Sequence, residues 1–209
     1  MRNDYNGIAN YYDRLSRIVF QRSIIKAQAY LLEFVQDNNR ILLVGGGTGW
    51  ILEEISNLNK QNVSVAYVEK SAKMIELSKK RRYKNISVEF INCPVETYTT
   101  QQQFDIILTP FLFDNFIDKK IKYIFLKLDN YLKKRGFWLY ADFVNDKQNN
   151  KAWQQLLLKT MYTFFKLTTN IETQNLVDLK HYFEEKYVMI TRQFYYKHFI
   201  QAVAYRKIR

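Results

Sequence analysis

Short apolar runs alternate with amphipathic segments through the first two thirds of the chain. Five runs have the length and the polar borders that are typical of strands; they span residues 41–44, 63–68, 86–91, 104–108 and 137–143. Three segments between them carry apolar residues at helical spacing; they span residues 51–58, 71–82 and 117–132. Gly136 is expected to end the third of these helices. Because strands and helices alternate, the pattern predicts a parallel α/β sheet with right-handed crossovers.

The pattern changes at both ends of the chain. Helical spacing predicts helices within residues 8–36, and again at about residues 147–167 and 175–184. Two strand-like runs follow, 186–196 and 198–206, and the very short connection between them permits only an antiparallel pair. The prediction is a Rossmann-like, doubly wound sheet of seven strands with an N-terminal helical extension and a C-terminal β-hairpin.

Length and composition favour a single domain. The 209 residues include 47% hydrophobic residues and no linker rich in Gly, Ser or Pro. We expect a helical cap over residues 1–38, a sheet core over 39–145, and C-terminal helices with the hairpin over 146–209. One cysteine and two histidines exclude a disulfide scaffold and a multi-cysteine metal site. No run is long enough for a membrane span, and the N-terminus lacks the apolar segment of a secretory signal, so the expectation is a cytoplasmic protein without a metal.

The net charge of +12 has two interpretations. An acidic partner such as nucleic acid would explain it. Alternatively, the cations lie on solvated surfaces, with the clusters at residues 79–82 and 133–135 at helix ends, where cations suit the helix dipole. The bias extends over the whole composition, which favours the second interpretation.

The turn after the first strand contains a glycine pattern. In residues 41–50, ILLVGGGTGW, Gly45, Gly47 and Gly49 form G-x-G-x-G between a buried strand and a helix. Small residues there allow a sharp turn and a close approach of a ligand to the backbone. The dinucleotide fingerprint fails because Trp50 or Leu52 stands where its third glycine belongs, and the P-loop Gly-Lys-Ser/Thr is absent.

A carboxylate follows the second strand. Glu69 lies about twenty residues beyond the glycines, at the position where an acid accepts hydrogen bonds from ribose hydroxyls. The two features together predict a site for a ligand that contains a ribose.

On these features the sequence resembles the class I S-adenosylmethionine-dependent methyltransferases. The resemblance covers nearly the whole chain, through VGGGTG, VEKSAKMIELSKK, VEFINCPVETY, FDIILTPFLFDNF and the final hairpin. The segment IANYYDRLSRIVF is similar to the entry helix of the ubiquinone/menaquinone C-methyltransferase-like branch. The resemblance implies a seven-stranded sheet with an antiparallel last strand, S-adenosyl-L-methionine as cofactor, and methyl transfer as activity.

The resemblance also implies a set of cofactor-binding residues. They are Gly45, Gly47 and Gly49 under the methionine and ribose, Glu69 on the ribose, Lys70 and Met74 beside the adenine, Cys93, Pro94 and Val95 at the adenine edge, Thr109 near the transferable methyl group, and Tyr12 closing over that end. Two positions depart from the family, because Leu43 and Cys93 replace acids. The second departure leaves adenine recognition to backbone groups near Val95 or to Glu96.

The methyl acceptor is less well defined. Displacement at a sulfonium needs alignment in a dry pocket, and a base only if the acceptor must lose a proton. Acceptor-pocket candidates at the carboxyl ends of the strands are Tyr5, Tyr11, Phe111, Phe113, Asp114, Asp142, Tyr162 and Phe165. Asp114 and Asp142 are the best polar candidates, although each is equally suited to capping a helix.

Three functions are consistent with the sequence. A small-molecule methyltransferase is the leading hypothesis, because residues 109–112, Thr-Pro-Phe-Leu, lack the Asp/Asn/Ser-Pro-Pro-Tyr/Phe motif of DNA amino-methyltransferases. A nucleic-acid methyltransferase or binder that uses the basic surface is the second. A non-catalytic protein that retains the fold is the third, suggested by Leu43 and Cys93.

Overall fold

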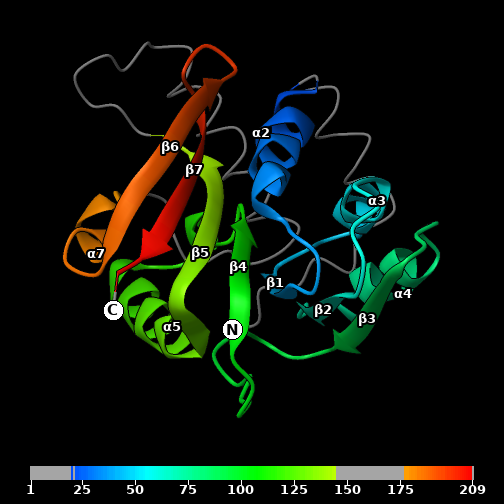
Figure 1. Cartoon of the computed structure of the whole chain (residues 1–209). Helices are drawn as coiled ribbons and strands as arrows, with labels where there is room; N and C mark the ends of the chain where they lie inside the picture. The colour runs from blue at the N-terminus through cyan, green and yellow to red at the C-terminus, as the bar shows by residue number, and fades with distance from the viewer. Residues whose placement is uncertain (1–19, 21, 145–176, 209) are drawn as a thin grey trace.

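The central sheet has the topology expected for the chain (Figure 1). The computed structural model describes residue 20, residues 22–144 and residues 177–208. Its seven strands lie in the order β3-β2-β1-β4-β5-β7-β6. They are β1 (Arg40–Val44), β2 (Val63–Val68), β3 (Ile86–Ile91), β4 (Phe104–Pro110), β5 (Leu132–Phe143), β6 (Tyr187–Tyr195) and β7 (Ile200–Lys207). Strands β1 to β5 pair in parallel, and β7 is antiparallel to both of its neighbours, β5 and β6.

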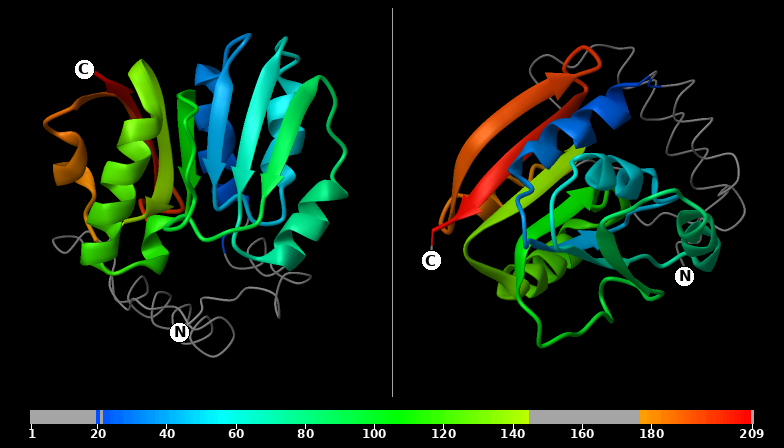
Figure 2. Two further views of the ribbon diagram at one scale, coloured as in Figure 1. Left: turned by 90° about the horizontal axis from the view of Figure 1, so that it is seen from below. Right: turned by 45° about the vertical axis from the view of Figure 1, so that its right-hand side comes forward.

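Helices cover both faces of the sheet (Figure 2). The helix α2 (Ser23–Leu31), the 3-10 helix Leu32–Phe34 and α3 (Trp50–Asn57) pack on one face. The helices α5 (Asp118–Tyr131) and α7 (Lys180–Phe183) pack on the other. α4 (Ala72–Lys79) connects β2 to β3, and the 3-10 helix η2 (Phe113–Asn115) follows β4. The helix expected at residues 147–167 lies outside the described residues.

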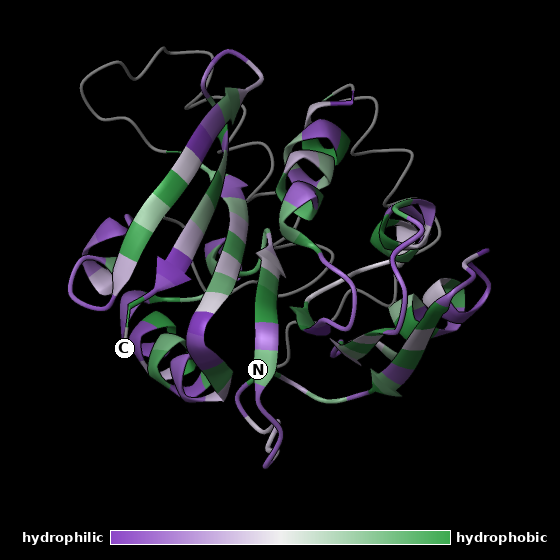
Figure 3. Cartoon of the chain, in the orientation of Figure 1, coloured by the Kyte–Doolittle hydropathy of each residue, from purple (hydrophilic) through white to green (hydrophobic). Residues whose placement is uncertain are grey.

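The central strands are apolar because both of their sides are covered. In β1, Ile41 and Leu43 belong to the core on the α2 and α3 side, whereas Leu42 and Val44 belong to the core on the α5 side. A strand buried on both faces has an unbroken apolar run rather than an alternating one. Figure 3 shows the same hydrophobic character along most of β4.

The basic cluster at residues 79–82 lies at a helix end, as expected. α4 begins after Ser71, whose side chain accepts a hydrogen bond from the backbone N–H of Met74, and it ends at Lys79. Beyond it, the Arg81 guanidinium donates hydrogen bonds to the carbonyl and the hydroxyl oxygen of Thr48, both at 2.9 Å. This cation therefore holds the glycine turn to the end of α4.

The expected role of Gly136 is corrected by the structure. α5 ends at Tyr131 and β5 begins at Leu132, so the cluster at residues 133–135 lies in a strand. The pairing of β4 with β5 shifts register between Phe104 and Ile106. A Cβ at Gly136 would lie 2.9 Å from the carbonyl oxygen of Asp105, so the close approach of the two strands requires glycine there.

None of the helices in the described part of the chain is long and apolar enough to cross a membrane.

Candidate functional site

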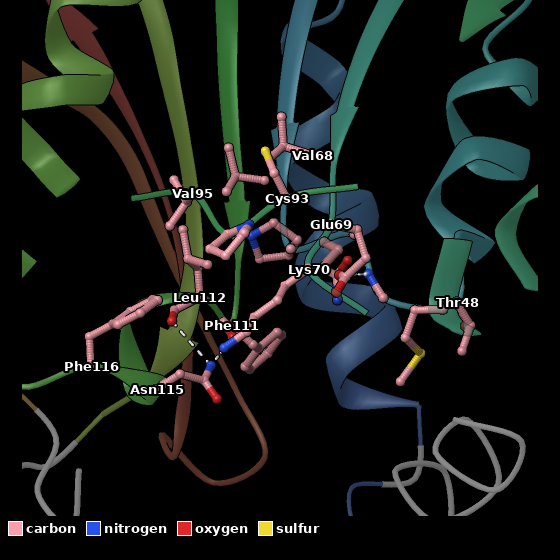
Figure 4. Close-up of a pocket in the computed structure, with 18 of the residues that line it drawn as sticks. Thr48, Val68, Glu69, Lys70, Cys93, Val95, Phe111, Leu112, Asn115 and Phe116 are labelled. Carbon is pink, nitrogen blue, oxygen red and sulfur yellow. Dashed lines mark hydrogen bonds between the residues drawn. The ribbon is translucent and has the colours of Figure 1, made fainter. Parts of the chain in front are cut away.

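A cavity opens at the carboxyl ends of β1, β2 and β4, which is where open α/β sheets bind ligands (Figure 4). α2 contributes to the same wall from the N-terminal side. Nine of the residues expected at the site line this cavity; they are Gly45, Gly47, Glu69, Lys70, Met74, Cys93, Pro94, Val95 and Phe111. The fold thus brings together segments from four separate stretches of the sequence.

The glycines of the turn meet different constraints. Gly45, Gly47 and Gly49 have φ values of +74°, +60° and +78°, which side-chain-bearing residues rarely adopt. A Cβ at Gly47 would meet no atom within 4 Å, so this residue leaves space open in the cavity wall. A Cβ at Gly49 would lie 2.3 Å from the Cβ of Ser78, so Gly49 allows α4 to approach the turn rather than lining the cavity. Gly46 is equally restricted, by the Tyr67 ring at 2.5 Å.

Glu69 is fixed by the backbone around it. Its carboxylate accepts hydrogen bonds from the backbone N–H of Gly47, at 3.1 Å to Oε2, and from that of Ser71, at 2.8 Å to Oε1. The residue is 8% exposed, and burial raises its pKa, although the backbone N–H donors of Ser71, Gly47 and Lys70 act in the opposite direction. Each carboxylate oxygen can accept more than one hydrogen bond. The fixed carboxylate can therefore still accept hydrogen bonds from the hydroxyl groups of a ligand in the cavity.

Two expected site residues belong to the core instead. Thr109 is fully buried, and its hydroxyl accepts a hydrogen bond from Nε1 of Trp138 at 3.0 Å. Phe113 is 2% exposed and packs near Trp138 and Tyr140. Contrary to the expectation, neither residue lines the cavity, because both side chains lie on the α5 side of the sheet, next to Trp138. The remaining candidates, Tyr5, Tyr11, Tyr12, Tyr162 and Phe165, lie outside the described residues.

Comparison with known proteins agrees with this geometry. Residues 41–136 match a family model described as a methyltransferase domain. The chain shares with that family the segment that contains the glycine turn and Glu69. The chain is 26% identical over 197 residues to a malonyl-[acyl-carrier protein] O-methyltransferase of Ilyobacter polytropus. The alignment covers 88% of this chain and 68% of that protein.

Solved structures of methyltransferases share the fold of this chain at low identity. An N-methyltransferase of Bradyrhizobium japonicum in complex with S-adenosyl-L-homocysteine has a TM-score of 0.60 at 12% identity, over 96% of this chain and all of that chain. A magnesium protoporphyrin IX methyltransferase of Synechocystis with the same compound bound has a TM-score of 0.66 at 11% identity, over 95% of this chain and 88% of that chain. The agreement extends to nearly the full length of the sheet and helices.

The structure shows the surroundings of the two residues that depart from the family pattern, Leu43 and Cys93. Leu43 is fully buried in the core on the α2 and α3 side, so it is an apolar packing residue. Cys93 lines the cavity, and burial raises the pKa of its thiol, which keeps it a neutral and weak acceptor. The preceding Asn92 amide is engaged, since it donates to the carbonyl oxygens of Glu69 and Lys70 at 2.9 Å each. Glu96, which also lines the cavity, is the carboxylate on this side of it.

The sequence pattern did not single out several residues of the cavity wall. Gln28 and Trp50 line the cavity from α2 and α3, and Asn115 lines it from η2. Gln28 is 5% exposed on the buried side of α2, so a polar residue on an apolar helical face was the available signal. Asn115 Nδ2 donates to the carbonyl oxygens of Phe111 and Leu112, both at 3.1 Å, and so holds the loop after β4. The sequence alone offers no equivalent signal for this asparagine.

Asp114 and Asp142, the polar acceptor-pocket candidates, do not line the cavity but lie next to its wall. Asp142 is at the carboxyl end of β5 and Asp114 is in η2. Burial raises the pKa of both carboxyls, and the charge of Asp142 raises that of Asp114 further. Neither residue caps one of the described α-helices.

Proposed function

We propose that the cavity binds S-adenosyl-L-methionine and that the protein transfers its methyl group to a small-molecule acceptor. The observation that carries this proposal is the junction of Gly47 and Glu69, which places an open backbone turn and a fixed carboxylate in one wall. A ribose needs two acceptor positions for its hydroxyls, and the two oxygens of Glu69 supply them. The cofactor itself would supply an electrophilic methyl group on a positively charged sulfur.

The described residues have separate roles in this proposal. Gly45 and Gly47 would let the methionine and ribose parts lie against the backbone, and Glu69 would hold the ribose. Met74, Cys93 and Val95 would flank the adenine with apolar and weakly polar surface. Ile24, Ile25 and Gln28 of α2 would cover the cavity and exclude water, which favours an in-line displacement between aligned groups.

The small-molecule acceptor is supported by the wall beyond β4. Phe111 and Phe116 give this end of the cavity an aromatic lining, with Leu112 between them. In the basic cluster at residues 79–82, Arg81 contacts the cavity wall. It donates a hydrogen bond to Thr48 and forms an ion pair with Glu53, so it contributes to the fold. These contacts favour an acceptor with apolar surface over a polyanion.

Calorimetric titration tests cofactor binding directly. We expect S-adenosyl-L-methionine and S-adenosyl-L-homocysteine each to bind with a stoichiometry of one, in the same cavity. We expect no binding of NAD. Either ligand should also raise the melting temperature in proportion to the logarithm of its concentration above the dissociation constant. Absence of binding by both adenosyl compounds would overturn the proposal and favour a non-catalytic protein.

A labelling experiment tests the acceptor class. The protein would be incubated with methyl-tritiated S-adenosyl-L-methionine and either a small-molecule cell extract or purified total RNA. We expect label in the small-molecule fraction. Label in RNA, with steep dependence on salt concentration, would instead support the nucleic-acid alternative.

A further inference from the structure

One polar side chain of the cavity wall has no partner among the described residues. Gln28 on α2 lines the cavity and is 5% exposed, and its carboxamide forms no hydrogen bond within the part of the chain that the structure describes. Its helical neighbours Ala27 and Leu31 are fully buried in the core. A carboxamide has two donors and one acceptor oxygen, and leaving them unpaired at a buried position is unfavourable. Their partners must therefore come from a molecule that fills the cavity.

Gln28 lies below apolar residues of the same helix. α2 runs from the carboxyl edge of the sheet toward the amino edge, where β1 begins at Arg40 (Figure 1). Ile24 and Ile25 precede Gln28 by one turn on the same face of α2, and both also line the cavity. The carboxamide is thus one helical turn deeper than two apolar side chains, which favours a ligand that is shielded from water at this point.

α2 reaches the cavity from the side opposite to the residues around the proposed adenine position. It packs on β5, β7 and α3. Cys93 and Val95 follow β3, the edge strand beyond β2, and Met74 belongs to the helix between these two strands. Glu69, at the end of β2, lies between the two sides. A ligand whose ribose is held by Glu69 and whose base lies toward β3 therefore extends its other end toward β1, β4 and α2.

Other polar side chains of the lining are already engaged or lie on the side of β2 and β3. The Thr48 hydroxyl accepts a hydrogen bond from Arg81 at 2.9 Å. The Asn115 amide donates to backbone carbonyl oxygens of the loop after β4. Lys70 follows β2, and Glu96 follows β3. Among the described residues of the lining, Gln28 is therefore the polar side chain that remains available to the far end of the ligand.

We propose that the Gln28 carboxamide binds the amino-acid end of the adenosyl cofactor, with its N–H groups donating to the carboxylate and its oxygen accepting from the ammonium group. This inference rests on the proposed function. The amino-acid end carries one negative and one positive charge, and a carboxamide offers a donor and an acceptor to match them. Hydrogen bonds to charged groups are stronger than those between neutral groups. Gln28 would therefore select ligands that carry this end.

The start of α3 supports the same placement of the carboxylate. α3 begins at Trp50, which lines the cavity, and no side chain caps this end of the helix. The uncapped N-terminal end of a helix carries a partial positive charge and favours a carboxylate. α2 and α3 are in contact. A carboxylate between them would meet both the Gln28 amide and the N-terminal end of α3.

Calorimetric titration with two adenosyl thioethers tests this inference without knowledge of the methyl acceptor. S-adenosyl-L-homocysteine carries the amino-acid end, whereas methylthioadenosine has a methyl group in its place. We expect the wild-type protein to bind the first about 100-fold more tightly. Gln28→Met replaces the carboxamide with an apolar chain of similar length. It should weaken binding of S-adenosyl-L-homocysteine by about tenfold or more, and it should leave the affinity for methylthioadenosine within about twofold of that of the wild type.

Controls separate a binding role from a structural one. Gln36→Met makes the same exchange at an exposed position beyond α2 and should bind both compounds as the wild type does. Without ligand, Gln28→Met should melt at no lower temperature than the wild type, because its carboxamide has no hydrogen bond to lose. Gln28→Leu is a second variant for which we expect the same results.

Two outcomes would overturn the inference. The first is a wild-type preference for S-adenosyl-L-homocysteine in both Gln28 variants. The second is an equal loss of affinity for the two compounds, which would place Gln28 against the adenosyl part. Failure of S-adenosyl-L-homocysteine to bind the wild type would overturn the proposed function instead.

Discussion

The backbone N–H of Gly47 donates a 3.1 Å hydrogen bond to Oε2 of Glu69, so the turn after β1 and the end of β2 meet at one carboxylate. The Tyr67 hydroxyl adds a second link, because it donates to the carbonyl oxygen of Gly47 at 2.8 Å. Both groups of the same glycine are thus held by β2. The turn is arranged before any ligand arrives, which reduces the ordering that binding requires.

Removal of the Glu69 carboxylate should weaken cofactor binding. We expect Glu69→Ala to reduce the affinity for S-adenosyl-L-homocysteine by roughly 1.5–3 kcal/mol, the scale of hydrogen bonds to a charged group. Isothermal titration measures this change. Glu76→Ala, which removes an exposed carboxylate from α4, is the control and should bind as wild type does. Equal affinities in the two variants would show that the ribose lies elsewhere.

Neighbouring glycines should separate binding from folding. Gly47→Ala puts an alanine at a left-handed φ, which should cost about 1–2 kcal/mol of stability. Its methyl group would also occupy open space in the cavity wall and should weaken cofactor binding. Gly46→Ala should destabilise the fold more, because its Cβ would lie 2.5 Å from the buried Tyr67 ring. Urea unfolding and calorimetry on both variants check this order. A Gly47→Ala protein with unchanged affinity would contradict the assignment of this residue to the binding wall.

Thr109 should matter for stability and not for binding. Thr109→Val removes the acceptor of the Trp138 Nε1–H and leaves that donor buried and unpaired, which destabilises by about 1–3 kcal/mol. Thr109→Ser keeps the hydroxyl and should recover most of that loss. Urea unfolding measures both, and titration with S-adenosyl-L-homocysteine should give wild-type affinity for each. Weaker binding at full stability would instead restore Thr109 to the cofactor site.

Acid should weaken the junction of α5 with the C-terminal hairpin. Asp129 is buried, which opposes its ionisation, but the side chains of Lys186, Tyr187 and Lys207, which contact its carboxylate, outweigh burial and lower its pKa. A depressed carboxyl pKa contributes stability above the unfolded value, and this contribution is lost as the pH falls through the folded value. Asp129→Ala should cost about 3–5 kcal/mol at pH 7, because Lys207 then remains buried without its partner. Urea unfolding should show a smaller difference from wild type at pH 3 than at pH 7.

A rise in pH should lower the free energy of unfolding through the ionisation of Asp142. Burial raises the pKa of this carboxyl to about 7, from its ordinary value of 3.8. A raised carboxyl pKa contributes stability that is complete below the unfolded value and is lost as the pH rises through the folded value. The unfolding free energy of the wild type should therefore decline between pH 4 and about pH 7 through this group. Asp142→Asn cannot ionise and should give a flatter profile; an identical slope in the two proteins would show that the group titrates normally.

Alternation of apolar runs and amphipathic segments was sufficient to predict which segments form the strands of the sheet and that the last two strands form an antiparallel hairpin, because each element's periodicity reflects which of its faces is buried. The boundary between α5 and β5 was missed. Gly136 is a helix terminator in local terms, yet it is needed at the point where β4 and β5 come within contact distance. Contacts between residues such as Ile106 and Phe137, which are 31 positions apart, leave no local trace around residue 136.

The amino-acid sequence by itself determined the fold class and the principal features of the cavity, since a glycine turn after a buried strand and an acid after the next strand are local patterns. Tertiary structure decided which side of the sheet each later residue faces. It directed Thr109 and Phe113 into the core and brought Asn115 to the cavity wall. It also placed Asp114 next to Asp142, 28 positions away, because two parallel strands joined by a long helix end at the same edge. A side chain's neighbours across a sheet depend on register and on burial, which are properties of the whole packed chain.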